Sequence, residues 1–81
     1  MNLTMPTNQK NFQRLTIKTN LYVYFSHGVP IALITPVDRL IAKGFEKKRD
    51  TDDHLAHIRR QHNELQEVPL SKIIKVANYF L

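Results

Sequence analysis

The sequence predicts an α+β domain in which a small antiparallel sheet, either a hairpin or a three-stranded meander, packs against two C-terminal helices. The sheet is indicated by residues 21–35, where two runs of β-branched and aromatic residues flank Ser26-His27-Gly28. The helices are indicated by apolar residues at steps of three and four within residues 51–65 and 71–80. A chain of 81 residues has the length of one domain.

The N-terminal residues 1–13 are polar and cannot repay the entropy cost of ordering. We therefore expect a flexible segment there, outside the core, followed by a single domain over residues 14–81. From Leu15 the alternation of apolar and polar residues predicts a first strand. Thr19-Asn20 is a candidate turn into the next strand.

The central hairpin is predicted because Gly28 can adopt the positive φ that a short loop needs. In the strand before it, Leu21, Val23 and Phe25 share one face, and two tyrosines lie on the other. Both faces of the hairpin are apolar, so we expect both to be covered by other elements.

Residues 35–45 allow two interpretations. As a helix, Thr35 would be the N-cap, Pro36 the first helical residue and Gly44 the stop signal. As a strand, residues 39–45 would extend the hairpin into a meander after a turn at Pro36-Val37-Asp38. Local signals favour the helix slightly, but the family resemblance described below favours the strand, which we adopt.

The first C-terminal helix begins at a cap provided by Asp50 or Thr51, and acidic residues occupy its positively polarised first turn. Residues 68–70 break the chain, and Ser71 can cap the second helix. The predicted core consists of apolar residues on the inward faces of these elements: Leu15, Ile17, Leu21, Val23, Phe25, Ile31, Leu33, Ile41, Leu55, Ile58, Leu65, Ile73, Ile74 and Ala77.

Motifs for catalysis are weak. The chain has no cysteine, and Ser26 and Ser71 have no identifiable base in the sequence. The two glycines form no phosphate-binding loop. The spacing of His54 and His57 permits a shared metal, but no third ligand is indicated, so we expect both to flank the buried face of the helix, with His62 partly buried. We predict a protein that is not an enzyme and needs no metal or cofactor.

The charge balance points to binding. Twelve Lys and Arg against seven Asp and Glu give a formal charge of +5, which attracts polyanions or an acidic protein face. We predict a non-catalytic protein that binds an acidic protein surface or a nucleoprotein complex, with nucleic-acid binding as the alternative. The candidate binding residues are the basic side chains around the first helix and two tyrosines that could serve as anchors if exposed: Lys43, Lys47, Lys48, Arg49, Arg59, Arg60, Tyr22 and Tyr24.

The sequence has no apolar run of the roughly 20 residues that a membrane span requires, and no signal-peptide pattern at its start. We therefore expect a cytoplasmic protein without a membrane partner. A small sheet leaves an edge strand unpaired, and few charges lie within residues 21–35, so we also predict a homodimer formed through sheet edges.

Three segments, taken in order, resemble an uncharacterised family of short phage and prophage proteins: residues 24–32, 51–58 and 68–74. The family has a tyrosine-turn-Pro-Val-Ala hairpin followed by a threonine-capped helix with a His-Ile pair. The resemblance implies that Thr51 and His57 are structural, although Asp52-Asp53 departs from the family pattern. It also implies a mobile-element origin. Small phage proteins often bind and block a host complex, including defence complexes, so an inhibitor of that kind is the expected function.

Overall fold

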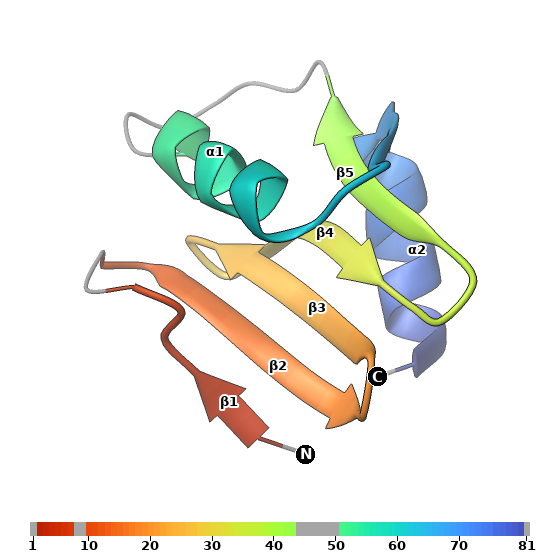
Figure 1. Cartoon of the computed structure of the whole chain (residues 1–81), viewed down its shortest axis with the longest axis horizontal. Coiled ribbons are helices and arrows are strands. Elements are labelled where there is room, and N and C mark those ends of the chain that lie inside the picture. Colours follow the sequence, from red (N-terminus) through yellow and green to blue (C-terminus); the bar gives the residue numbers. More distant parts are fainter. Residues whose placement is uncertain (1, 8–9, 44–50, 81) are drawn as a thin grey trace.

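The protein is an α+β domain built on one six-stranded mixed sheet with a helix on each face (Figure 1). The computed structural model describes residues 2–7, 10–43 and 51–80. The strands follow one another across the sheet in chain order, and all neighbours are antiparallel except β5 and β6, which are parallel. The elements are β1 Asn2–Thr4, β2 Phe12–Lys18, β3 Leu21–Ser26, β4 Val29–Ile34, β5 Arg39–Lys43, α1 Thr51–Gln61, β6 Gln66–Pro69 and α2 Leu70–Phe80.

The predicted hairpin is confirmed as β3 and β4, joined by the two residues His27 and Gly28. Both have positive φ, 52° and 77°, which matches the twist of the flanking strands. A Cβ on Gly28 would meet no heavy atom within 4 Å, so the backbone conformation, and not lack of space, favours glycine. The turn is held from outside, because the His27 N–H donates to the Asn11 carbonyl at 2.8 Å.

Residues 39–43 form a strand, which confirms the strand interpretation over these residues and excludes the helix. Residues 44 and 45 of the predicted strand lie outside the described residues. The Thr35 hydroxyl accepts hydrogen bonds from the backbone N–H of Val37 at 3.2 Å and of Asp38 at 2.8 Å. A helix N-cap uses the same bonding pattern, which explains why the local signals favoured a helix. Here the Thr35 N–H also donates to the Asp38 carbonyl at 2.7 Å and closes a tight turn.

The sheet is larger than the predicted hairpin or three-stranded meander. Residues 2–4 add β1 at one edge, and Gln66–Pro69 adds β6 at the other. We expected only a chain break at residues 68–70, but Pro69 is tolerated in β6 because it ends an edge strand. The hairpin therefore lies inside the sheet, so the edges that a homodimer would use are those of β1 and β6, and the homodimer itself stays a prediction.

Both helices lie at the predicted positions, but their first and last residues differ from the prediction. α1 begins at Thr51 and ends at Gln61, four residues before the predicted end. The chain then turns through Glu64, whose φ is 59°, and so leaves the helix path before β6. α2 begins at Leu70, which places Ser71 inside the first turn. No helix among the described residues is long and apolar enough to span a membrane.

The two helices cover opposite faces of the sheet, as expected for a hairpin that is apolar on both sides (Figure 1). The predicted core residues that are buried are Leu21, Val23, Ile31, Leu33, Ile41, Leu55, Ile58, Ile73 and Ala77. Leu15, Ile17 and Phe25 are only partly buried, because α2 packs mainly against β4, β5 and β6 and leaves part of β2 and β3 uncovered. Leu65 and Ile74 are also only partly buried.

Phe12 was excluded from the predicted core, and this was wrong. Its side chain is fully buried and stacks on the ring of His54, with centroids 4.5 Å apart and planes at 6°. The polar residues around Phe12 hid its role, because β2 begins before the alternating pattern that starts at Leu15. The expected mobility of residues 1–13, and the domain start at residue 14, stay predictions.

The packing of the core leads to a prediction about stability. Replacing the fully buried Ile58 by Ala should lower the free energy of unfolding by about 2 to 5 kcal/mol, because a cavity remains where the side chain packed. The same change at the half-buried Ile74 should cost less, since part of that site is open to solvent. Urea unfolding measures both. Equal losses at the two positions would contradict the assigned packing.

Candidate functional site

The candidate site lies on the α1 face of the sheet, where the strand register brings polar side chains from distant segments into rows. Arg14 on β2 is directly opposite Tyr24 on β3. In the next row, Tyr22 is opposite Ile34, which in turn is opposite Arg39 on β5. Residues directly opposite one another share a face, so these side chains all lie on the side that α1 covers in part.

Arg14 is the central residue of the site. Its guanidinium lies over the ring of Tyr22, with the Cζ atom 5.0 Å from the ring centroid, which is a cation–π distance. Its charge also acts on the Tyr24 hydroxyl, whose pKa it lowers against the larger effect of burial. The Nε atom is buried and makes no hydrogen bond within the described part of the chain. Arg14 is thus held by aromatic groups instead of a carboxylate.

Tyr24 connects Arg14 to the end of α1, because its hydroxyl lies 2.9 Å from Nε2 of His62. The neutral ring of His62 either accepts from the Tyr24 hydroxyl or donates to its oxygen, depending on the tautomer. Burial raises the pKa of Tyr24 above its ordinary value, although Arg14 lowers it, so the hydroxyl keeps its proton.

The two histidines at this face lie in a positive electrostatic environment. Burial lowers the pKa of His57, and the charges of Arg60 and Arg14 lower it further. Burial also lowers the pKa of His62, followed by the charges of Arg39, Arg14 and His57. Every charge that contributes to these shifts is positive. We call Arg14, Tyr22, Tyr24, His57 and His62 the Arg14 cluster.

A polar cavity of about 290 Å³ adjoins this cluster and shares Tyr22 and His62 with it. Its other lining residues are Asn20, Ile34, Thr35, Pro36 and Arg39. One Arg39 nitrogen donates to the Asn63 carbonyl at 3.2 Å, which fixes the guanidinium near the negatively polarised end of α1. A larger apolar cavity of about 360 Å³ lies between the β4–β5 turn and α2 and shares no residue with the Arg14 cluster.

The structure separates the predicted binding residues into four groups. Arg60, Lys43 and the half-buried Tyr22 remain on or near the surface, whereas Arg59 is paired with Glu67 at 3.0 Å. Tyr24 is only 1% exposed and packs against Phe12 and His62, so the condition under which it could serve as an anchor is not met. The remaining three, Lys47, Lys48 and Arg49, lie outside the described residues.

Sequence reasoning missed Arg14 and Arg39 and treated the histidines only as packing residues. His62 is half-buried, as expected, but it also faces the polar cavity. Arg14 could not be placed from the turn alone. A regular hairpin that turns at residues 19–20 would pair Arg14 with Phe25, and the irregularity between Thr16 and Lys18 shifts the register so that Arg14 lies opposite Tyr24. Arg39 could not be placed while residues 35–45 were open between helix and strand.

Ser26 does have a histidine partner, contrary to our expectation. Its Oγ lies 2.8 Å from Nδ1 of His54 and 3.2 Å from Oγ1 of Thr51. Ser26 and His54 are 3% and 0% exposed, so the pair is closed to a substrate and fastens α1 to the hairpin. His54 is therefore in the core, and not at the border of the buried face. Within the described ranges, no three His, Asp or Glu side chains gather as a metal-binding group.

The lowered pKa values predict how stability depends on pH. The unfolded chain binds protons at His57 and His62 near their ordinary pKa of 6.5, whereas the folded chain binds them only at lower pH. Stability should therefore be full above about pH 7 and fall as the pH drops through 6.5 toward the lowered values. In urea unfolding, the double variant His57→Gln, His62→Gln should lose less stability over this range. An unchanged pH dependence would contradict the assigned environments.

Geometry and charge define the candidate site. A scan against protein-family models, a search of curated proteins and a search of solved structures each found no match to this chain. The resemblance to short phage proteins therefore stays a prediction. What the structure offers for function is a face on which arginines and histidines converge on two tyrosines.

Proposed function

We propose that the protein is a non-catalytic binding protein that recognises an acidic protein surface through the face around the Arg14 cluster. The observation that carries this proposal is that the strand register and α1 bring Arg14, Arg39 and Arg60 to one face with His57 and His62, where burial and positive charges lower the pKa of both rings. Clustered like charges repel one another and cost stability, so such a face is typical of a site that meets opposite charge on a partner.

Three arginines supply most of this charge without a carboxylate partner among the described residues. Arg14 contacts tyrosines, Arg39 bonds to a backbone carbonyl, and the exposed Arg60 lies in the last turn of α1. Arg59 differs, because Glu67 balances it. The guanidinium groups can therefore offer N–H donors to carboxylates, which they bind with short, charge-assisted hydrogen bonds.

The geometry favours a protein partner over single-stranded nucleic acid. Proteins that bind single strands present exposed aromatic rings on which bases stack. Here Arg14 covers one side of Tyr22, and Tyr24 is buried. At the other end of α1, Asp52 and Asp53 occupy the first turn and repel a phosphate from the helix N-terminus.

The biological setting that we propose follows from the family resemblance. The protein would be encoded by a phage or another mobile element, act in the host cytoplasm, and bind a host protein complex so as to block it, with defence complexes as candidate targets. The hairpin residues that carry the resemblance include the buried Tyr24 and Ser26, and the helix residues include the buried Thr51 and His54. These positions hold α1 against the sheet and thereby support the proposed face.

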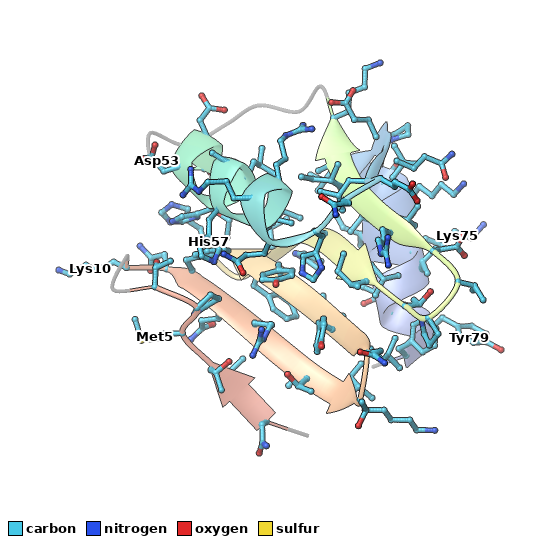
Figure 2. All side chains as sticks on the ribbon, in the orientation of Figure 1. Met5, Lys10, Asp53, His57, Lys75 and Tyr79 are labelled. Atoms are coloured by element: carbon cyan, nitrogen blue, oxygen red, sulfur yellow. The ribbon has the colours of Figure 1, made fainter. Side chains whose placement is uncertain are left out.

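A charge-matched pair of variants tests the proposed function. The triple change Arg14→Gln, Arg39→Gln, Arg60→Gln removes three positive charges from the proposed face. The control Lys18→Gln, Lys72→Gln, Lys75→Gln removes three exposed charges from β2 and α2 instead; Lys75 is labelled on α2 in Figure 2. We expect a fluorescent glutamate-rich peptide to bind at least tenfold more weakly to the first variant than to the control.

The same assay with a single-stranded oligonucleotide of equal charge tests the alternative function, which is nucleic-acid binding. Tighter binding of the oligonucleotide, with a steep loss of affinity on adding salt, would overturn the protein-binding proposal in favour of nucleic acid. Equal weakening by both triple variants would show that net charge acts without a defined face. Circular dichroism at the assay temperature checks that each variant is folded.

A further inference from the structure

The polar cavity beside the Arg14 cluster has the chemistry of a binding site for a negatively charged group. Its walls come from the β2–β3 turn, β3, β4, the β4–β5 turn, β5 and the residue that follows α1. None of its lining residues is acidic, and two of them, Arg39 and His62, are strong N–H donors. Arg39 uses one N–H on the Asn63 carbonyl and retains four others.

The donors of the cavity are oriented before any ligand arrives. The bond to Asn63 fixes the guanidinium of Arg39, and the bond with the Tyr24 hydroxyl fixes the ring of His62. In the tautomer in which Nε2 accepts from Tyr24, and in the protonated ring, Nδ1 carries a proton and can donate. Donors that are already ordered lose little entropy on binding, which favours affinity for a small group.

We propose that this cavity receives one carboxylate side chain, from Asp or Glu of the acidic partner, between Arg39 and His62. The inference rests on the proposed function for the identity of the partner as a protein, and it adds the chemical group and the place where that group binds. A carboxylate suits the cavity because its two oxygens can accept from the planar guanidinium and from an imidazole N–H.

Binding should be linked to proton uptake at His62. The groups that act on this ring are Arg14 from β2, Tyr22 and Tyr24 from β3, Arg39 from β5 and His57 from α1. None of them carries a negative charge at neutral pH, so a bound carboxylate would place an anion beside the ring and would favour its protonated form. Affinity for the carboxylate should therefore increase as the pH falls from about 7 toward the lowered pKa of the free protein.

The test is an NMR titration of the full chain with N-acetylglutamic acid amide, with the neutral N-acetylglutamine amide as the matched probe. We expect the acid to move the ring resonances of His62 and to raise its pKa, and the glutamine amide to leave them in place. Loss of the signal in His62→Gln assigns the resonance. In Arg39→Gln, affinity for the acid should be about tenfold weaker. Lys75→Gln on α2 should bind as the unmodified chain does.

Three results would overturn the inference. They are an unmoved His62 resonance at saturating acid, equal shifts with the two probes, and a response to inorganic phosphate but not to the acid. These results are distinguishable from failure of the proposed function. If the glutamate-rich peptide still binds and depends on Arg14 and Arg60, the face is correct and the cavity assignment is wrong. If the peptide does not bind but the acid moves His62, the cavity stands and the protein partner is wrong.

Discussion

The attachment of α1 to the sheet is the constraint on which the rest of the site depends. α1 has 11 residues, which is too short to be a stable helix alone. It is fixed through His54, whose ring stacks on Phe12 and whose Nδ1 bonds to Ser26 of the hairpin. Because His57 and His62 follow at steps of three and eight residues, this attachment also sets where they meet the strands. The buried contact between His54 and Ser26 thus helps to position the polar side chains of the candidate site.

The second constraint is the register of the sheet. The β2–β3 pairing places Arg14 against Tyr24, and the β4–β5 pairing places Arg39 one row away. A shift of one residue would move these side chains to the opposite face, where α2 packs, and would separate them from the histidines. The positive-φ turns at Asn20 and His27-Gly28 fix the ends of β3 and so help to hold this register.

The site brings positive charges together, which costs stability. The fold limits this cost in two ways. Both histidines are driven toward their neutral forms, so their rings add no further repulsion to that among the arginines. The ring of Tyr22 lies against the guanidinium of Arg14 and stabilises the cation. A face with unbalanced positive charges makes the fold less stable than it would be if those charges were paired. Such a loss of stability is expected where a protein binds another molecule.

The sequence by itself determined the hairpin, both helices and most of the core, because these follow from short-range patterns: turn residues, caps and apolar periodicity. It also indicated that tyrosines and basic residues would occur together near the first helix. Tertiary structure alone decided the rest. β1 and β6 are short and polar, so they form strands only because a neighbouring edge supplies hydrogen-bond partners. Likewise, only the packed sheet shows that Glu67 pairs with Arg59 and that Arg14 and Arg39 both act on His62, because short-range patterns do not specify contacts between separate elements.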